Sequence, residues 1–273
     1  MNAMLELSDR EFDRLVKFMH ERYGINLSRK RVLIEGRLRL MLSQRGYTSY
    51  TAYIDDLERD VSGKEVSTLV SKLTTNYTYF LREETHYDFM TAKILPKWRT
   101  ERRPGGYQIW SAACSSGEEP YSISMVVSNF FGFSPHSNIA ITASDISDGV
   151  LTKARAGNYT ADQIEKLPPA WVTSFFVKNA DNTYTVSNAL KKMVTYQYFN
   201  LNATTHWPRQ HYDVIFCRNV MIYFDVETKK RLVARLYEAL KPGGYLFIGM
   251  SETLINLGVD FVYVQPSIYQ KKP

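Results

Sequence analysis

The hydrophobic pattern of the sequence changes near residue 106, and this change most constrains how the chain can fold. Beyond that point, short apolar segments that predict strands alternate with longer segments that predict helices. Consecutive parallel strands need helical crossovers, so the alternation predicts a doubly wound, mostly parallel sheet. The predicted strands are 107–111, 139–143, 212–217 and 244–249, and the predicted helices are 120–131, 147–156 and 227–240. Two last segments, 259–264 and 268–270, predict a closing hairpin.

The first hundred residues predict helices alone. Ser8 and Glu11 fit a capping box, apolar residues follow at helical spacing, and Gly24 ends that helix. Further helices are predicted at 28–45, about 48–57 and 63–73. The run Arg102-Arg103-Pro104-Gly105-Gly106 then breaks the pattern. The expected fold class is α/β: an N-terminal all-α helical bundle followed by a Rossmann-like sheet domain.

The alternation of strands and helices is interrupted between residues 157 and 198. Two short strand candidates, 174–178 and 184–186, flank a turn at Asn179-Ala180-Asp181-Asn182. We predict a small antiparallel β insertion over about 157–196.

Composition limits the class of protein. The 273 residues are 44% hydrophobic and 23% charged, as in ordinary globular proteins. No stretch reaches the roughly 18 apolar residues of a membrane span, and the start of the sequence lacks a secretory signal. We therefore expect a cytoplasmic protein without direct membrane insertion. Cys114 and Cys217 are far apart and the five histidines form no ligand pattern, so no metal is expected.

The net charge of +6 is concentrated in one segment. Between residues 22 and 45 seven basic residues stand against one acid, Glu35, so the local excess is also +6. The basic residues are Arg22, Arg29, Lys30, Arg31, Arg37, Arg39 and Arg45. This segment indicates an acidic partner, although a solvated helix face would have the same composition.

The strand at 107–111 runs into the small residues of AACSSGEEP at 112–120. A strand, a run of small residues and a helix start are typical of a nucleotide site in a doubly wound sheet. Two acids would repel a pyrophosphate, and no G-x-G-x-x-G is present, so a cationic ligand such as S-adenosylmethionine is favoured. Asp145, at the end of the next strand, can accept both ribose hydroxyls. Both features also have an ordinary structural interpretation: the loop at 112–120 could be a simple strand–helix turn, and Asp145 could be the N-cap of the next helix.

Several spaced segments resemble the signatures of the CheR family, the chemotaxis receptor glutamate methyltransferases. These segments are TTNYTYFLRE (74–83), WSAACSSGEEPYS (110–122), ASDI (143–146), FCRNVMIYF (216–224), LKPGG (240–244) and GMSE (249–252). The resemblance covers nearly the whole chain, so we predict a helical substrate-docking domain over 1–82 and a methyltransferase domain over 83–273.

The resemblance implies an O-methyltransferase that uses S-adenosylmethionine to form glutamate γ-methyl esters on the cytoplasmic helical bundle of chemoreceptors. It implies catalytic roles for Arg82 and Tyr223. Without a catalytic role, Arg82 could form a surface ion pair and Tyr223 could pack in the core. Implied cofactor contacts are Asn76, Thr78, Arg82, Ala113, Gly117, Glu119 (with Glu118 as the neighbouring candidate), Asp145, Asn200, Leu201, Arg218 and Asn219.

Receptor docking is expected through Arg31, Arg37 and Arg39 of the basic segment. In some members of the resembling family the β insertion grips a C-terminal receptor peptide with a longer, glycine-containing loop. Here the connection is only Asn179-Ala180-Asp181-Asn182-Thr183. We therefore predict that the protein does not depend on a receptor tether.

Two alternatives belong to other functional classes. A nucleic-acid methyltransferase would suit the positive charge, but the position of the usual [Asp/Asn]-Pro-Pro-[Tyr/Phe] turn reads Arg218-Asn219-Val220-Met221, so no nucleic-acid partner is expected. The other alternative is an inactive, cofactor-binding scaffold, and intact Asn76, Arg82, Asp145 and Tyr223 argue against it.

Overall fold

The computed structural model describes residues 5–74, 77–101, 103–133 and 138–273. The helices are α1 (Asp9–Tyr23), α2 (Arg31–Gln44), α3 (Tyr50–Arg59), α4 (Lys64–Leu73), α5 (Thr85–Phe89), the π-helical turn η1 (Met90–Ile94), α6 (Leu95–Thr100), α7 (Glu118–Phe130), α8 (Asp148–Ala156), α9 (Ala161–Ile164), α10 (Pro169–Phe175), α11 (Asn188–Lys191), the 3-10 turn η2 (Met221–Tyr223) and α12 (Val226–Ala239). The strands are β1 (Tyr107–Ala112), β2 (Ile139–Asp145), β3 (Asn158–Tyr159), β4 (Phe176–Lys178), β5 (Tyr184–Val186), β6 (Val194–Tyr198), β7 (Tyr212–Cys217), β8 (Leu240–Ile248), β9 (Phe261–Gln265) and β10 (Ile268–Lys271).

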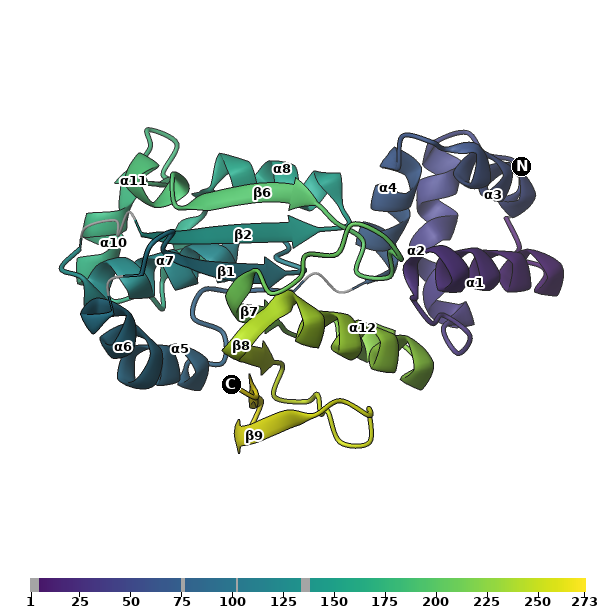
Figure 1. Cartoon of the computed structure of the whole chain (residues 1–273). Coiled ribbons are helices and arrows are strands. Elements are labelled where there is room, and N and C mark those ends of the chain that lie inside the picture. Colours follow the sequence, from purple (N-terminus) through teal and green to yellow (C-terminus); the bar gives the residue numbers. More distant parts are fainter. Residues whose placement is uncertain (1–4, 75–76, 102, 134–137) are drawn as a thin grey trace.

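The N-terminal helices α1 to α4 form a compact bundle at one end of the molecule (Figure 1). The predicted capping box is confirmed, because the Ser8 side chain accepts from the Glu11 amide and the Glu11 carboxylate accepts from the Ser8 amide. Gly24 ends α1 in the left-handed conformation that glycine adopts without steric cost. The bundle is therefore built from locally encoded helices whose apolar faces meet in one core.

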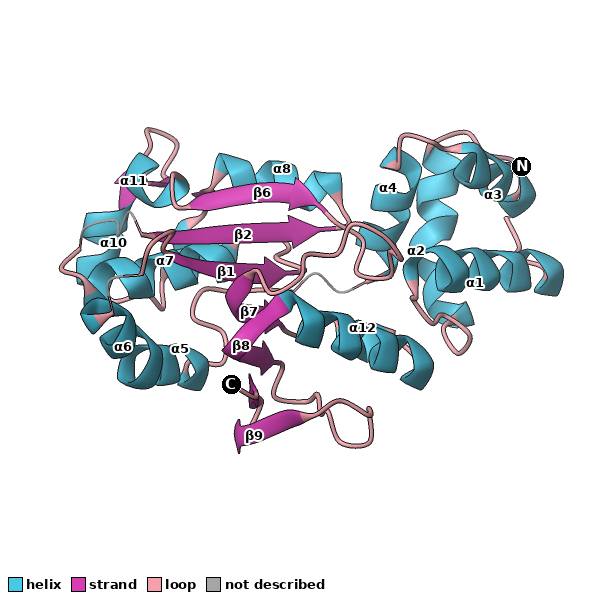
Figure 2. Cartoon of the chain, viewed as in Figure 1, coloured by secondary structure: helices cyan, strands magenta, loops and turns pink. Residues whose placement is uncertain are grey.

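The sheet domain has the strand order β6-β2-β1-β7-β8-β10-β9. The first five of these strands are parallel, and β10 and β9 add the predicted antiparallel hairpin. The predicted Rossmann-like class is thus confirmed. The arrowheads of β1, β2 and β6 point toward the helical bundle, so the carboxyl ends of these strands face it (Figure 2).

Alternation along the strands divides the core into two layers. Ile109, Val214 and Phe216 belong to the cluster that includes α5, α6 and α7. Trp110 and Ile215, their neighbours along the strands, belong to the cluster that includes α12 and the bundle. This division follows from the period of two in a strand, which sends successive side chains to opposite faces of the sheet.

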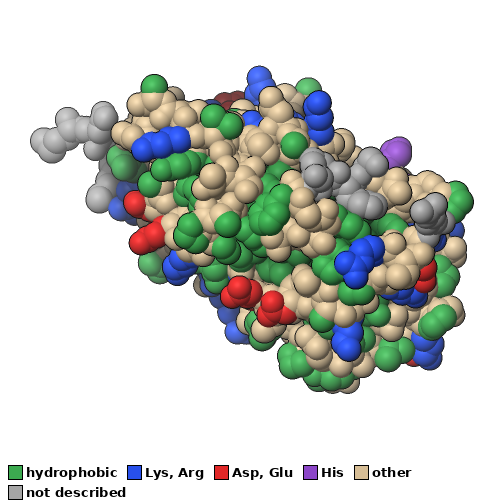
Figure 3. Space-filling view, turned by 90° about the vertical axis from the view of Figure 1, so that its left-hand side faces the viewer, with side chains coloured by type: hydrophobic (Ala, Val, Ile, Leu, Met, Phe, Trp, Pro, Cys, Tyr) green, Lys and Arg blue, Asp and Glu red, His purple; other side chains and the backbone are tan. Residues whose placement is uncertain are grey.

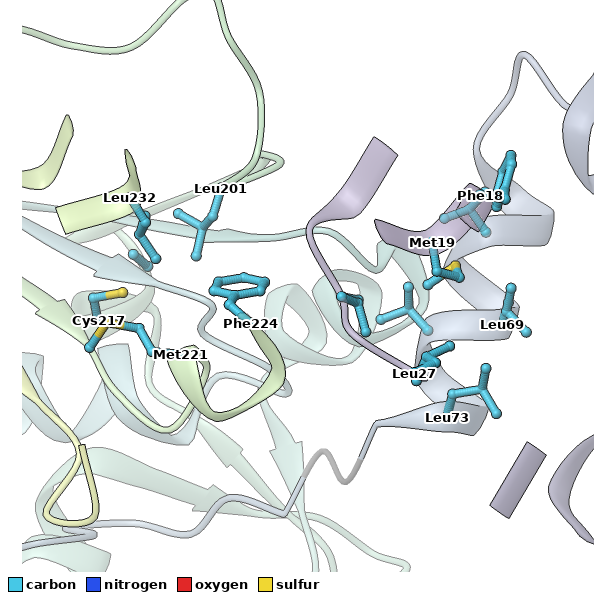
Figure 4. Close-up of a cluster of buried hydrophobic side chains, with 14 of the residues drawn as sticks. Phe18, Met19, Leu27, Leu69, Leu73, Leu201, Cys217, Met221, Phe224 and Leu232 are labelled. Carbon is cyan, nitrogen blue, oxygen red and sulfur yellow. The ribbon is translucent and has the colours of Figure 1, made fainter. Parts of the chain in front are cut away.

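The bundle and the sheet domain share one of these hydrophobic clusters. Met19, Leu27 and Leu73 lie on the bundle side, and Met221 and Phe224 lie on the sheet side (Figure 4). Polar contacts join the same surfaces: the His20 ring forms a hydrogen bond with the Asp225 carboxylate, and the Asn26 amide donates to the Tyr223 carbonyl at 2.8 Å. The position of the bundle over the carboxyl ends of the strands is therefore fixed by packing as well as by the covalent link.

The β insertion contains a small antiparallel sheet of order β3-β5-β4. The two predicted strands are confirmed, although residues 174–175 belong to α10, and β3 is not predicted by the sequence pattern. Neither is β6, which pairs with β2 at the edge of the main sheet.

The end of the molecule that carries α10 and α11 faces the viewer in Figure 3, where hydrophobic side chains lie among Lys and Arg side chains. None of the helices in the described ranges is long and apolar enough to cross a membrane.

Candidate active site

A cavity of about 290 Å³ lies where the carboxyl ends of β1, β2 and β7 meet the bundle. This is the switch point of the sheet, where consecutive connections leave in opposite directions and where ligands bind in doubly wound folds. Residues from both parts of the chain line it. The predicted site residues in its wall are Thr78, Arg82, Ala113, Glu119, Asp145, Asn200, Leu201, Arg218, Asn219 and Tyr223.

The loop after β1 reaches the cavity in a left-handed conformation. Ala113 has a φ of 70° and Ser115 a φ of 50°, which are uncommon values for residues with a Cβ. Gly117 begins α7 with a φ of 99°, and a Cβ there would meet the Ala154 Cβ at 2.9 Å. Gly117 does not itself line the cavity. Its absent side chain lets α8 pack closely against the loop.

Asp145 holds this loop in place. One carboxylate oxygen accepts from the Ser115 amide at 2.9 Å, and the other accepts from the Ser147 amide at 3.0 Å. Burial raises the pKa of Asp145 above its ordinary value, although these backbone hydrogen bonds oppose the shift. Asp145 therefore connects the ends of β1 and β2 and presents a buried acid to the cavity.

Arg218, directly after β7, is the centre of a buried charge network. Its side chain is 2% exposed, and its guanidinium lies 3.1 Å from carboxylate oxygens of both Glu83 and Glu119. The same guanidinium donates to the Tyr87 hydroxyl at 3.3 Å and to the Arg82 carbonyl. Two partly buried acids around one cation leave a formal charge of −1 beside the cavity.

The two acids of this network titrate differently. Burial raises the pKa of Glu119, and Arg218 and the Ser111 hydroxyl oppose it only in part. Burial also acts on Glu83, but Arg218 and the Met250 amide leave its pKa below the ordinary value. Glu83 accepts from two nitrogens of the Arg218 guanidinium and Glu119 from one, and of these two acids Glu119 is the one that lines the cavity.

Arg82 and Tyr223 lie at the cavity from different segments. The Arg82 guanidinium donates to the Tyr77 carbonyl at 2.8 Å and lies over the Tyr79 ring, 5.8 Å from its centroid. Tyr223 is half-buried at the end of η2. Tyr77 and Ile222 add exposed apolar surface, with 67% and 54% of their area accessible. The cavity therefore opens through a rim that is partly apolar.

Comparison with known proteins places this arrangement in one family. The family described as "CheR methyltransferase, all-alpha domain" matches residues 10–74, and "CheR methyltransferase, SAM binding domain" matches residues 76–269. The chain belongs to the CheR methyltransferase family. A chemotaxis protein methyltransferase of Borreliella burgdorferi is 39% identical over 99% of this chain and 97% of its own length. That of Escherichia coli is 35% identical over 98% of this chain and 93% of its own length.

This CheR-family protein is accordingly an S-adenosylmethionine-dependent methyltransferase of chemotaxis. The cavity suits such a cofactor, which carries positive charges and no phosphate. Glu119 and Asp145 supply partly buried acids, while Ile146, Phe199 and Leu201 supply the apolar part of the wall. No group of three or more metal-ligating side chains occurs among the residues described in the structure.

Asn200 and Asn219, two further predicted cofactor contacts, line the cavity. Asn76, another, lies outside the described residues. The Asn200 amide donates to the Arg22 carbonyl at 2.8 Å, and its side-chain oxygen accepts from the Asn202 amide, so this side chain is already engaged by the loop. The Asn219 side chain donates to Glu83 at 3.2 Å. The role of each in cofactor binding stays a prediction.

Glu118, the alternative to Glu119, points elsewhere. Its side chain accepts from the Ser116 hydroxyl at 2.7 Å, and it is 2% exposed. It does not line the cavity, whereas Glu119 does. Between the two neighbouring acids the geometry favours Glu119 for a cofactor contact.

The three arginines predicted to dock a receptor differ in how free they are. Arg31 forms ion pairs with Asp9 at 2.7 Å and Glu35 at 3.2 Å. Arg37 is exposed, although one of its nitrogens donates to the carbonyls of Lys72 and Thr74. Arg39 is half-buried, with its Nε shielded from solvent. Arg37 is thus the member of the predicted set that faces outward.

Two acids of the site have no role in the sequence prediction. Glu83 connects Arg218 with Asn219 and the Met250 amide. Glu252 accepts from the amides of Asn219 and Met221 and fixes the turn after β7. Both acids stand inside the quoted family segments, but no sequence spacing indicates that positions 83, 218 and 252 meet.

Proposed function

We propose that this methyltransferase esterifies glutamate side chains on the cytoplasmic helices of chemoreceptors, as a protein-glutamate O-methyltransferase. The carrying observation is that Arg82 and Tyr223, a charged and a neutral hydrogen-bond donor, line the same cavity as the acids Glu119 and Asp145. An anionic substrate beside the two donors and a cationic cofactor beside the two acids would each meet groups of opposite charge or hydrogen-bonding character. The names of the relatives support a role in chemotaxis, and the glutamate substrate is our inference.

A carboxylate substrate explains why the site needs no general base. A glutamate with a pKa of about 4.3 is ionised at neutral pH and is already nucleophilic. No histidine lines the cavity within the part of the chain that the structure describes. His86 is buried beside Glu83, and burial together with Arg218 lowers its pKa to about 4, so it is neutral. The protein has to orient and desolvate the substrate rather than deprotonate it.

Arg82 and Tyr223 divide the orientation of the carboxylate between them. Arg82 provides a charged donor and Tyr223 a neutral one. The Tyr77 carbonyl and the Tyr79 ring restrict the position of the guanidinium. A fixed guanidinium can hold one carboxylate oxygen and leave the other free to react.

S-adenosylmethionine supplies an electrophilic methyl group when it is bound. We assign Glu119 to its ammonium group and Asp145 to its ribose hydroxyls, because both are partly buried acids in the cavity wall. The net negative charge around Arg218 favours a cation at this position. Ile146, Phe199 and Leu201 would contact the adenine.

We propose further that the helical bundle docks the receptor and that the protein works in the cytoplasm, where the receptor helices lie. Arg37 supports this docking, because it is exposed and donates to the carbonyl of Thr74, a cavity residue. In this proposal the protein does not depend on a C-terminal receptor peptide bound to the β insertion. The short β4–β5 connection is a closed turn, because the Asn179 backbone amide donates to the Thr183 carbonyl and the Asn179 side-chain amide donates to the Thr183 hydroxyl.

The proposal is tested by methyl-labelled S-adenosylmethionine and membranes that contain chemoreceptors. We expect label on the receptors that mild alkali releases as methanol, since esters hydrolyse where N-methyl groups do not. Arg82→Ala protein serves as the control. Label that resists alkali, or that appears on nucleic acid in the same extract, would contradict the proposed reaction. An aromatic-rich receptor tail peptide that bound residues 174–186 at micromolar concentration would refute tether independence.

A further inference from the structure

The two donors that we place at the substrate, Arg82 and Tyr223, stand on backbone segments of unusual conformation. Arg82 lies between two left-handed residues, Leu81 with a φ of 57° and Glu83 with a φ of 58°. Asn219, in the turn that leads to Tyr223, also has a φ of 57°. Such values are uncommon for residues with a Cβ and persist where surrounding contacts impose them. Both segments therefore depend on the groups that hold their backbones.

Glu252 holds the turn that carries Tyr223. One carboxylate oxygen accepts from the Met221 amide at 2.8 Å, and the other accepts from the amides of Asn219 at 2.9 Å and Gly249 at 2.7 Å. These three donors are backbone N–H groups, which cannot reverse their role, so the side chain at 252 must accept on both of its branches. A carboxylate meets this requirement, whereas a carboxamide would direct an NH2 group at an N–H group.

Glu83 holds the segment that carries Arg82 in the same manner. One carboxylate oxygen accepts from two nitrogens of the Arg218 guanidinium, at 3.3 and 3.1 Å. The other accepts at 3.2 Å from both the Asn219 side chain and the Met250 amide. The Arg218 guanidinium also donates to the Arg82 carbonyl. Glu83 thus accepts on both branches too, and the backbone of Arg82 is held directly as well as through its neighbour.

The two acids share their partners. Asn219 donates to Glu252 through its backbone and to Glu83 through its side chain. In the loop after β8, the Gly249 amide donates to Glu252. The next amide, that of Met250, donates to Glu83. Neither acid lines the cavity, so the pair connects the segment and the turn without taking part in the cavity wall.

The separation of the two segments bears on the rate of methyl transfer. The attacking oxygen must stand in line with the bond between the methyl group and the sulfur, and a displacement of about 1 Å can lower the rate roughly 100-fold. A carboxylate held by donors from two segments is placed only as well as those segments are held relative to each other. In the proposed function Arg82 and Tyr223 are such donors. The contacts that join their segments thus act on the reaction from outside the cavity.

We propose that Glu83 and Glu252 are positioning residues for methyl transfer. Glu83 acts through Arg82, because it fixes the backbone on which that side chain stands. Glu252 acts through Tyr223 in the same way. The inference rests on the proposed function, since it takes these two donors as the groups that orient the substrate carboxylate.

Double-mutant cycles test whether each acid acts through its assigned donor. With the purified cytoplasmic fragment of a chemoreceptor as substrate, Glu252→Gln should lower kcat about 10- to 100-fold, counted per S-adenosylhomocysteine site found by calorimetry. In a Tyr223→Phe background the same change should lower kcat less than about threefold, because the group that it positions is already lost. Glu83→Gln should depend in the same way on Arg82, in an Arg82→Ala background. The receptor KM should change much less than kcat.

A second variant disturbs the same contacts without changing a charge. A Cβ at Gly249 would meet the Asn219 side-chain nitrogen at 2.5 Å and a Glu252 carboxylate oxygen at 2.9 Å. Gly249→Ala should therefore displace both groups and lower kcat per site as Glu252→Gln does.

Asp213→Asn is the matched control for a structural role. Asp213 is a buried acid at the start of β7, at the opposite end of that strand from the cavity. It accepts from the Gln108 amide at 2.8 Å and pairs with Arg103 and Lys241. Asp213→Asn should lower the melting temperature, because these contacts are weakened, and should keep the wild-type kcat per site.

The outcomes separate this inference from the proposed function. If wild-type protein esterifies the fragment, but Glu252→Gln keeps the wild-type kcat or lowers it equally in the Tyr223→Phe background, the inference is wrong and the proposed function stands. Activity lost only in proportion to the S-adenosylhomocysteine sites would show a structural role and overturn the inference as well. So would an equal loss of kcat per site in Asp213→Asn. Wild-type protein that forms no alkali-labile label on the fragment would refute the proposed function and the inference together.

Discussion

Replacing Glu119 with glutamine should weaken the cofactor site without weakening the fold. In Glu119→Gln the side chain keeps its shape and can still accept from Ser111, but it loses the charge that faces the cavity. A hydrogen bond to a charged group contributes about 1.5–3 kcal/mol, so S-adenosylhomocysteine should bind roughly 10- to 150-fold more weakly. The side chain is only 14% exposed, and solvent therefore screens this interaction little.

Glu119→Gln should lower the affinity for the cofactor, but it should not lower the stability of the fold. Because burial raises the pKa of Glu119, its ionised form is less favourable in the folded protein than in the unfolded chain. The stability linked to this group is present below the unfolded pKa and is lost as the pH rises through the folded pKa. At neutral pH, Glu119→Gln should melt at the same temperature as the wild type or higher, and Arg218 keeps Glu83 as its partner.

Glu118→Gln is the matched control. Glu118 is the neighbouring residue, it is also buried, and burial also raises its pKa, but it does not line the cavity. Isothermal calorimetry with S-adenosylhomocysteine and thermal unfolding of both variants give the comparison. Glu118→Gln should bind as the wild type does. Affinity retained within twofold in Glu119→Gln, or lost in Glu118→Gln instead, would refute the assignment of the ammonium contact.

Three further measurements test other parts of the site. Arg82→Ala should lower kcat by roughly 10- to 150-fold, from the loss of a charged hydrogen bond, with little change in melting temperature; equal activity would remove Arg82 from the mechanism. S-adenosylhomocysteine affinity should fall as the pH drops through the raised pKa values of Glu119 and Asp145, where these acids become protonated, and Glu119→Gln should flatten the calorimetric pH profile. Arg37→Glu should raise the receptor KM and reduce its dependence on salt in steady-state assays, because exposed charges act through a screened field; a wild-type KM insensitive to salt would contradict charge steering.

Much of the fold could be predicted because it is encoded locally. The capping box at Ser8, the stop at Gly24 and the apolar period of the first helices are signals within a few residues, and the structure confirms them. Strands β1, β2 and β7 were predictable from their apolar runs between turn signals. The edge strand β6 was not, since its residues after Val194 are largely exposed and polar or aromatic and have no inward alternation.

Most of the predicted site residues that line the cavity belong to a quoted family segment. Arg82, Asp145 and Arg218 stand in such segments and do meet at the cavity. The pairing of Arg218 with Glu83 depends on a tertiary contact across 135 positions of sequence, which no local pattern encodes.

The hydrophobic cluster shared by the bundle and the sheet domain sets a condition for exchanging receptor specificity between relatives. Leu27 and Leu73 on one side and Met221 and Phe224 on the other belong to a single core, so they must be complementary in shape. A chimera that takes only the bundle of a relative would bring one half of this core without the other. Transplanting α1 to α4 together with the turn at 220–225 keeps the core matched and carries Tyr223 along with the docking surface. We therefore expect that the bundle and the catalytic turn can be exchanged between relatives only together.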